Sequence, residues 1–510
     1  MATKDDALGG NATDSKPAAA KKAAAPKKAA PKKAAAQKPA APKKAAAPKK
    51  AAPKQAAAPK QAAAPKQAAA PKPSAAADAV LTRKTVVKAD RIAIVAGLRS
   101  PFARSWSTLN DVDPVELSTQ VARELLFRLD FPMDQLDEIV WGTVISVPTA
   151  PNVAREIALN LSQYRLPGFT VSRACATGVQ SLISATQMIL SGEREVVLAG
   201  GVDVTSHAPV VHKKHVIDVL KKAQKAKGLA LVQTLAQLNP LDLLPSPPAI
   251  AERYTGKTMG EHAELMAQNF DISRADQEAL AIASHANAHK ATTEGWIAGE
   301  VMAVQTPKGI VTEDNLIRAS MDAEKLATLR PAFDRKHGSI TAATSSALTD
   351  GAACVLVMKE SKAKELGYTP LGFVRGWEFA ALDPRVNLLL GNVYTVPGAL
   401  KKSGTTLADM DTIEIHEAFA AQVLSNIKLM NSKKFCADEL GLSSEVGEVD
   451  RSKLNRWGGS LAYGHPFAAT GGRILTQMLD ILGQIDGELG LASICAAGGL
   501  GVSIVLERAR

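Results

Sequence analysis

The hydrophobic pattern changes character within residues 169–192. A short apolar run at 169–171 ends just before Cys175, and apolar side chains then recur at three- and four-residue intervals from Val179 to Leu190. This pattern predicts a strand, a turn that carries Cys175, and a helix. A helix N-terminus favours the thiolate, so we expect a lowered pKa for Cys175. A cysteine among Ala, Val and Leu is also commonly buried and inert, and this pattern alone leaves both interpretations open.

The neighbouring segments show the same succession of strand and helix. Apolar runs near 91–102, at 138–147 and from residue 196 are typical of buried strands, and 113–130 has the period of a helix. Strands that alternate with helices at these spacings predict an α/β architecture with covered sheets.

A Lys-rich, helix-prone segment interrupted by prolines follows from about 206 to 332. We expect strands to resume at 339–341 and 352–358. A fresh strand at 370–376 opens what we interpret as a second, duplicated half. The predicted domains are a disordered tail (1–85), a first half (86–360) that contains a helical loop domain at about 206–335, and a second half (361–510).

Net charge is concentrated in the tail. The chain has a net charge of +11, yet residues 1–77 carry 17 lysines, no arginine and three aspartates, which leaves the rest at −3. Repeated Ala-Ala-Ala-Pro-Lys blocks cannot form a core. The tail is either a solubilising appendage or an unspecific, salt-sensitive polyanion binder. It does not make the whole chain a nucleic-acid-binding protein.

The four cysteines are too sparse for a disulfide framework and fit a reducing compartment. No apolar run reaches the roughly 18–20 residues of a membrane span, and the N-terminus lacks the core of a secretory signal. We therefore expect a cytoplasmic protein.

The glycine clusters lack the strand-turn-helix fingerprint of a dinucleotide site, so we expect no NAD.

Three further blocks contain reactive residues. In the first, the strand 412–415 leads into a helix with His416 at the junction. The second is the glycine-rich run 457–472, where Pro466 locks the backbone after His465, which suits a tight loop that orients one imidazole. The third, 493–506, reads as two apolar strands joined by a glycine-rich turn with Cys495 at its start.

These four blocks, in this order and near this spacing, resemble the thiolase family over residues 87–510. His416-Glu-Ala-Phe, in place of the Asn of many thiolases, and the Lys-rich insertion are similar to the β-subunits of fatty-acid oxidation complexes, which are 3-ketoacyl-CoA thiolases. The resemblance implies two related halves in αβαβα layers with a loop domain near CoA. It implies cleavage of 3-ketoacyl-CoA in β-oxidation, with CoA as a substrate and no cofactor.

The resemblance also implies a role for each site residue. Cys175 attacks the ketone, and His465 takes its proton. Cys495 is the acid and base for the acetyl-CoA leaving group and the incoming CoA thiol, in agreement with a cleavage that needs an acid/base on each side of the bond. His416, through a water, and His465 donate to one thioester oxygen, and the backbone N–H groups of Cys175 and Ala497 form a second oxyanion hole. Ser346 contacts pantetheine. One departure is the Ala468 that stands where many thiolases have glycine.

Other candidate groups carry little chemistry. His285 and His289 lie four residues apart on a probable helix at 277–290, a metal-binding spacing, but no third ligand is evident and we expect no metal site. Of the remaining cysteines, we expect Cys354 in the core and Cys436 at the surface.

The insertion leaves the choice of partner open. Residues 212–235 are basic and amphipathic, which suits a solvated lid helix, docking on a hydratase/dehydrogenase α-subunit, or contact of the 206–250 region with an anionic membrane surface. Acyl-CoA, CoA and a homo-oligomer are the other expected partners. The alternative functions are a biosynthetic acetoacetyl-CoA thiolase and a polyanion-binding scaffold with an idle enzyme body.

Overall fold

The computed structural model describes residues 90–510 apart from 211 and 245–250. The predicted tail at 1–85 lies outside the described residues. Within the described part, no helix combines the length and the apolar composition that a membrane crossing would need.

The main sheet is built from two equivalent sets of strands. The first half contributes β1 (Ile92–Arg99), β3 (Glu138–Gly142), β4 (Gly168–Val171), β5 (Val196–Val204) and β8 (Thr349–Lys359), and the second half β9 (Gly372–Ala381), β10 (Thr412–Ile415), β11 (Leu489–Ala496) and β12 (Leu500–Arg508). The order β3-β5-β8-β1 repeats as β10-β11-β12-β9, with one parallel pair followed by antiparallel pairs in each. The predicted duplication is therefore visible in the topology, and β1 joins β9 between the halves.

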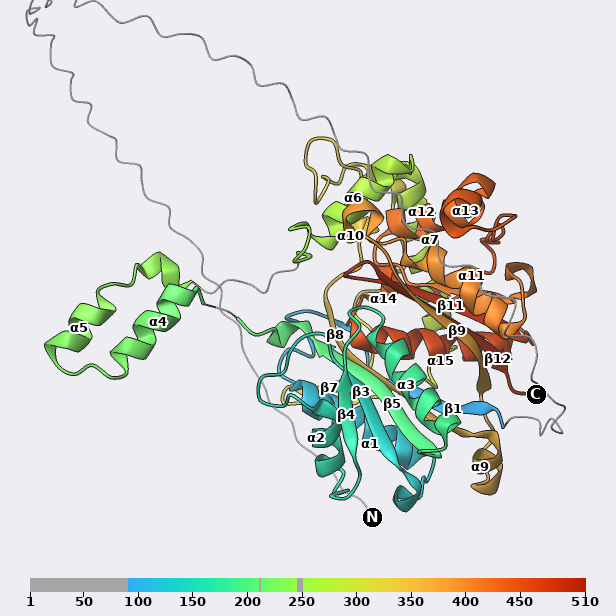
Figure 1. The fold of residues 1–510 in the computed structure, drawn as a ribbon, viewed down its shortest axis with the longest axis horizontal. Helices are drawn as coiled ribbons and strands as arrows, with labels where there is room; N and C mark the ends of the chain where they lie inside the picture. Colours follow the sequence, from blue (N-terminus) through green and yellow to red (C-terminus); the bar gives the residue numbers. More distant parts are fainter. Residues whose placement is uncertain (1–89, 211, 245–250) are drawn as a thin grey trace, which may run out of the picture. The chain divides into compact units, whose positions relative to one another are not determined.

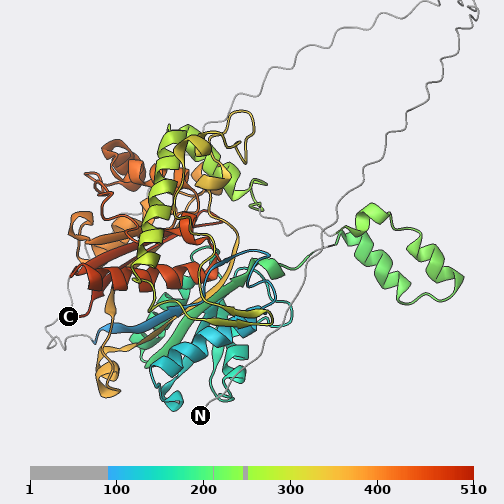
Figure 2. The same cartoon turned by 180° about the vertical axis from the view of Figure 1, so that it is seen from behind.

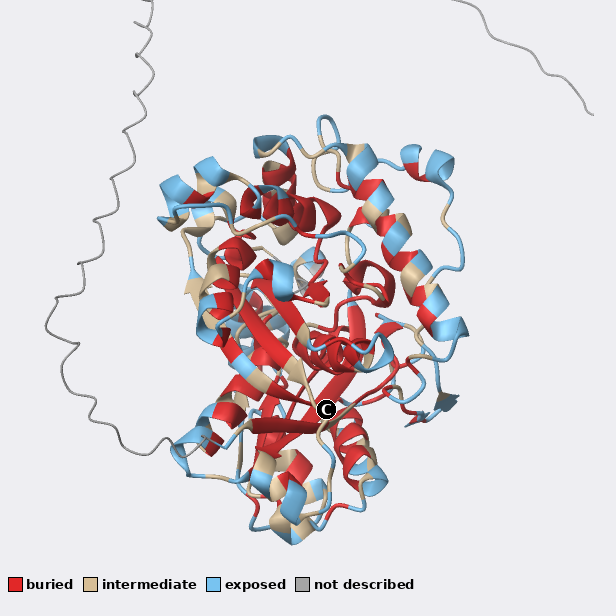
Figure 3. Ribbon diagram, turned by 90° about the vertical axis from the view of Figure 1, so that its right-hand side faces the viewer, coloured by how far each residue is buried: buried red, intermediate tan, exposed pale blue. Residues whose placement is uncertain are grey.

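The helices complete the layers. The first half has α1 (Pro114–Arg128), α2 (Val153–Asn160) and α3 (Thr177–Ser191), and the second has α11 (Gly391–Ser403), α12 (Ala420–Met430) and α15 (Ala468–Gln484). α3 and α15 pack on each other; α3 lies on strands of the first half, and α15 lies on strands of both halves. α1 and α2 cover the first half and α11 covers the second from outside (Figure 1). Figure 3 shows how thoroughly the centre is buried. This is the predicted αβαβα arrangement.

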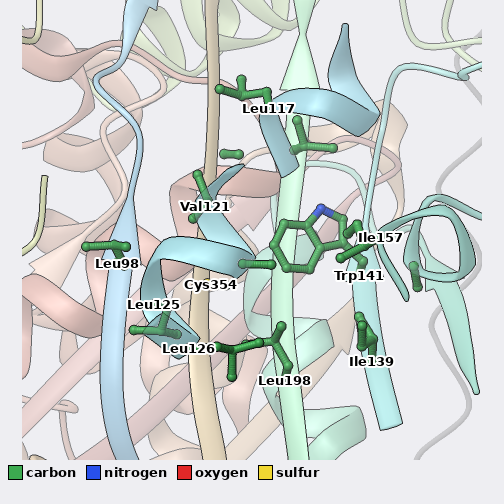
Figure 4. Packing of buried hydrophobic residues seen from close by; sticks show 14 of the residues in the cluster. Leu98, Leu117, Val121, Leu125, Leu126, Ile139, Trp141, Ile157, Leu198 and Cys354 are labelled. Atoms are coloured by element: carbon green, nitrogen blue, oxygen red, sulfur yellow. The ribbon is translucent and has the colours of Figure 1, made fainter. Parts of the chain in front are cut away.

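The core of the first half shows why its strands read as apolar runs. Trp141 of β3, Leu198 of β5 and Cys354 of β8 pack against Leu117 and Val121 of α1 (Figure 4). Cys354 is a core residue, as predicted. The prediction for Cys436 was wrong, because it is fully buried in α13 (Lys433–Leu440).

The inserted region is helical, as its composition predicts. It contains α4 (Lys214–Ala223), α5 (Leu229–Leu235), α6 (Met259–Asn269), α7 (Arg274–Thr293), α8 (Ala323–Ala327) and the hairpin β6 (Val304–Thr306) and β7 (Gly309–Val311). α4 and α5 pack on one another. α7, the long yellow-green helix of Figure 2, packs on α12 and on α14 (Ser460–Tyr463). The remaining short elements are β2 (Ala103–Arg104), α9 (Glu360–Glu365) and α10 (Pro384–Asn387).

Two predicted strands differ from the structure. The strand expected at 138–147 ends at Gly142, because the next residues turn to bind the Asp203 carboxylate through the N–H groups of Val144 and Ile145. Residues 339–341 form no strand, since the N–H groups of Ser339 and Ile340 donate to the Glu264 carboxylate instead of a neighbouring strand.

Candidate active site

Cys175 lies in the turn between β4 and α3, as the hydrophobic pattern predicts. The preceding Ala174 has φ 46°, a left-handed conformation that costs a non-glycine residue free energy and is concentrated at functional sites. The cap residue Ala176 has no side chain that could bind the first N–H groups of the helix. The half-buried sulfur therefore lies at an uncapped helix N-terminus.

The N-termini of α3 and α15 approach each other through two glycines. A Cβ on Gly178 would lie 2.5 Å from the Ala468 carbonyl oxygen, and one on Gly471 would lie 2.5 Å from the Val179 nitrogen. Both distances are shorter than any real Cβ contact, so only glycine permits this approach. The contact is important because His465 lies just before α15, as Cys175 lies just before α3.

His416 directly follows β10, and its N–H donates to the Ser493 carbonyl of β11 at 2.9 Å. The helix predicted to follow immediately begins only at Ala420, so His416 lies in a short connecting loop. Its ring is fully buried, with Nδ1 2.9 Å from the Ser460 hydroxyl.

His465 occupies the predicted tight loop between α14 and α15. Its N–H donates to the carbonyl of Ala347 and to the Thr349 hydroxyl, which ties the loop to the start of β8. Nδ1 lies 2.6 Å from the Thr470 hydroxyl. The ring of Phe467 packs edge-on against the imidazole at a centroid distance of 4.9 Å.

The structure brings the reactive groups together from both halves. The sulfur of Cys175 and one ring nitrogen each of His416 and His465 all lie within 4.8 Å of one another, and the two ring centroids are 4.2 Å apart. Both Nε2 atoms are buried and have no protein partner within the described chain, so they are available to a substrate. Cys495 is buried in β11, near enough for the charge of the Cys175 thiolate to raise its pKa, although burial raises it more.

The expectation of a lowered pKa for Cys175 was wrong. Burial raises the pKa of this thiol to about 11 and outweighs the backbone N–H groups of Ala497 and Cys175, which lower it. The nearby carboxyl of Asp203 raises the pKa of the thiol further. The resting site therefore holds a thiol, and its proton must be transferred to a base before the sulfur can attack.

Both imidazoles are neutral at physiological pH. Burial, together with the positive charge of Arg473, lowers the pKa of His465 to about 3. Burial lowers the pKa of His416 well below its usual value, and the charges of His465 and Arg473 lower it further. A neutral imidazole can accept a proton or donate one through its N–H, so this pair supports both general-base and oxyanion-binding chemistry.

Ala497 and Ser346 were also predicted to belong to the site. The N–H groups of Ala497 and Cys175 both act on the sulfur of Cys175 and lower its pKa, so both lie beside it. Ser346 is half-buried, and its N–H donates to the Ala418 carbonyl two residues beyond His416. It borders the site without a direct contact to any of the four reactive side chains in the described chain.

Four supporting residues were not predicted from the sequence, namely Ser460, Thr470, Arg473 and Glu417. Ser460 and Thr470 bind the two Nδ1 atoms. The Glu417 carboxylate accepts hydrogen bonds from the Leu461 N–H and the Ser284 hydroxyl, and so fixes the loop that carries Ser460. Ser460 and Thr470 lie in the same glycine-rich block as His465. This closeness along the chain is the sequence feature that could have identified them.

The histidine pair of α7 does not join a metal-type cluster in the described part of the chain. Nδ1 of His285 accepts the Arg318 N–H at 3.2 Å, so this imidazole serves as a buried hydrogen-bond acceptor. The group whose atoms could hold a metal ion is Cys175, His416 and His465, which are zinc-ligand types but also the predicted acid-base groups.

Comparisons with known proteins agree with this geometry. The thiolase N-terminal domain model matches residues 92–361, and the thiolase C-terminal domain model matches 368–508. These matches cover both halves of the sheet, and the chain belongs to the thiolase family.

Among its relatives, the 3-ketoacyl-CoA thiolase of Colwellia psychrerythraea is 47% identical over 431 residues, which cover 84% of this chain and 99% of that protein. The structure of Bacillus anthracis acetyl-CoA acetyltransferase matches with a TM-score of 0.69 and 32% identity, over 82% of this chain and 99% of that one. A human mitochondrial 3-ketoacyl-CoA thiolase in complex with CoA matches with a TM-score of 0.69 and 27% identity, over 82% and 98%.

Proposed function

We propose that this chain is a 3-ketoacyl-CoA thiolase of fatty acid β-oxidation, an acetyl-CoA C-acyltransferase. It cleaves a 3-ketoacyl-CoA with CoA into acetyl-CoA and an acyl-CoA two carbons shorter. The observation that carries the proposal is the convergence of one thiol and two neutral imidazoles within 4.8 Å, with the second buried thiol, Cys495, close enough to interact with the charge of Cys175. The sequence identity to named 3-ketoacyl-CoA thiolases supports the choice of reaction.

In the first half-reaction, Nε2 of His465 takes the proton of Cys175, and the sulfur attacks the C3 carbonyl of the substrate. The oxygen then becomes negative. The bond between C2 and C3 breaks, C3 becomes the thioester carbon on Cys175, and C2 leaves as the carbanion equivalent of acetyl-CoA. The thiol of Cys495 protonates C2. Its raised pKa keeps Cys495 protonated until that step.

In the second half-reaction, the Cys495 thiolate takes the proton of the incoming CoA thiol. The CoA sulfur attacks the acyl thioester and displaces Cys175, which recovers its proton from His465. Charge on the substrate oxygens is stabilised by the imidazole Nε2 atoms at one position and by the N–H groups of Cys175 and Ala497 at the other. Such prearranged donors typically lower the barrier by about 3 kcal/mol each.

A biosynthetic acetoacetyl-CoA thiolase is the alternative, because the same groups can run the condensation and an acetyl-CoA acetyltransferase shares this fold at 32% identity. Chain length separates the two functions. Thiolysis that extends to medium and long 3-ketoacyl-CoA supports the proposal, and activity restricted to four carbons supports the alternative.

The test is thiolysis of 3-ketoacyl-CoA from short to long chain by wild type, Cys175→Ala and Cys495→Ala. We expect a loss of at least about 10⁴-fold for Cys175→Ala, with no acyl adduct in the intact mass of the protein. Cys495→Ala should lose turnover while Cys175 stays reactive toward iodoacetamide. Cys354→Ala, a buried cysteine outside the site, is the matched control and should keep wild-type turnover. Substantial thiolysis by Cys175→Ala would contradict the proposal.

The other partner predictions concern assembly. A homo-oligomer, a hydratase/dehydrogenase α-subunit, a cytoplasmic location and a polyanion-binding tail stay predictions from the sequence. The insertion offers an exposed apolar face on α5, where Leu229 is 73% and Val232 62% exposed. These side chains lie three residues apart, on the segment predicted to contact a partner or a membrane surface.

A further inference from the structure

The two imidazoles of the site differ in what binds their Nδ1 atoms. His465 pairs with Thr470, whose hydroxyl has no second partner within the described chain. His416 pairs with Ser460, whose oxygen also lies 3.4 Å from Nη2 of Arg473. A hydroxyl with one neighbour can donate or accept, whereas a hydroxyl that already accepts from a guanidinium has its own proton free to donate.

The direction of the hydrogen bonds at His416 follows from Arg473. A guanidinium has donors and no acceptor, so the Ser460 oxygen accepts from Nη2. Within the described chain Nδ1 of His416 is the one other hydrogen-bond partner of this hydroxyl, so the Ser460 proton points to Nδ1. Nδ1 is then an acceptor, and the proton of the neutral ring is on Nε2. That is the buried atom left without a protein partner in the described chain.

We propose that Arg473 and Ser460 are positioning residues that hold His416 in the Nε2–H tautomer, so that it serves as a fixed hydrogen-bond donor, while His465 on Thr470 is free to exchange its proton. The structural assignment stands by itself, and its catalytic consequence rests on the proposed function. In this proposal His416 only donates a hydrogen bond to the substrate oxygen, and His465 transfers the thiol proton.

Arg473, Ser460 and His416 form a relay of hydrogen bonds, and the surrounding residues keep it in place. Arg473 is 1% exposed, donates to Gln477 at 2.7 Å, and has its guanidinium carbon 5.2 Å from the Tyr463 ring centroid. Ser460 is fully buried between Gly459 and Leu461, whose N–H groups donate to Ser284 and Glu417. Water therefore does not compete for Nδ1, and rotation of Ser460 away from it would leave a buried nitrogen unpaired.

The direct test is NMR of the free protein with ¹⁵N-labelled histidine. The chain has nine histidines, so the His416 signals are assigned by their loss in His416→Gln. We expect a pyrrole-type Nε2 and a pyridine-type Nδ1 for His416 in the wild type, and a shift of Nδ1 toward pyrrole character in Ser460→Ala. A wild-type His416 protonated on Nδ1, or an unchanged pattern in Ser460→Ala, would overturn the proposal.

The kinetic test uses the same variant. Ser460→Ala should lower kcat about 10- to 100-fold with KM within about threefold, because a donor to the transition state is misplaced. Ser460→Ala added to His416→Ala should cause no further loss, since Ser460 acts only through His416. Ser118→Ala removes another buried hydroxyl, bound to the Pro114 carbonyl in α1, and should match wild type. A further loss in the double variant would overturn the relay.

Failure of the two proposals can be told apart. A wild-type protein that cleaves no 3-ketoacyl-CoA removes the proposed function and leaves the NMR assignment of His416 intact. An active wild type with His416 protonated on Nδ1 removes the relay alone.

Discussion

The N-termini of α3 and α15 are equivalent places in the two halves, yet they are used differently. Each helix begins within three residues of a reactive side chain, Cys175 or His465. At α15 the Ala468 N–H donates to the Asp203 carboxyl at 2.8 Å, so this terminus already has a side-chain partner. At α3 no side chain caps the helix, and the Cys175 thiol lies just before its first residue.

This difference affects the charge that each terminus can stabilise. The uncapped terminus of α3 stabilises negative charge on a sulfur once the proton is gone. His465 at the other terminus is neutral because of its burial and the positive charge of Arg473. The free energy cost of burial still dominates at α3, because the pKa of Cys175 stays above that of an ordinary cysteine. Thiolate formation is thus coupled to proton transfer to His465 and does not precede it.

We expect the largest effect from a substitution that separates the N-termini of α3 and α15. Gly178→Ala puts a methyl group 2.5 Å from the Ala468 carbonyl. We expect the free energy of unfolding to fall by about 2–3 kcal/mol or more, and turnover by about 10²-fold, because Cys175 and His465 move apart. Urea unfolding and steady-state thiolysis measure these two effects.

Gly483→Ala is the matched control in α15, because a Cβ there meets nothing within 4 Å. It should stabilise the protein by up to about 1 kcal/mol and leave turnover unchanged. Equal behaviour of the two variants would show that the glycine contact does not position the site.

A smaller effect concerns the raised pKa of Cys175. Below pH 9 both folded and unfolded states hold the thiol proton; between pH 9 and about 11 only the unfolded state loses it, so stability falls as pH rises. For a half-buried thiol we expect a loss of about 1–2 kcal/mol over this window. Urea unfolding of wild type and Cys175→Ala at pH 8 and 10.5 measures it.

In Cys175→Ala this loss should be absent, while the contributions of the other buried thiols remain. A stability difference between the two proteins that stays constant with pH would mean that the pKa of Cys175 is ordinary. A difference that grows in favour of wild type at high pH would reverse its sign.

The smallest expected effect is at Ala174, next to the nucleophile. Ala174→Gly relieves the strain of φ 46° but adds freedom to the unfolded chain, so the two contributions nearly cancel within about 1 kcal/mol. The exposed Ala286 of α7 has ordinary helical geometry, and Ala286→Gly should cost about 1 kcal/mol without a gain. Thermal unfolding compares the two. A larger loss for Ala174→Gly would show that its backbone is unstrained.

Much of the fold could be predicted because hydrophobic period is a local property. The strand 412–415 matches β10, and the strand-turn-helix around Cys175 matches β4 and α3. The errors fall where a distant side chain competes for backbone N–H groups. Asp203 ends β3 early, and Glu264 takes the N–H groups of the segment predicted as a strand at 339–341.

The sequence by itself determined the reactive residue types and their local settings: Cys175 before a helix, His416 after a strand, and His465 and Cys495 in glycine-rich segments. Only the tertiary structure decided the sign of the Cys175 pKa shift and the relay through Ser460. Both depend on burial and on distances between segments far apart along the chain. No local pattern in the sequence contains those distances.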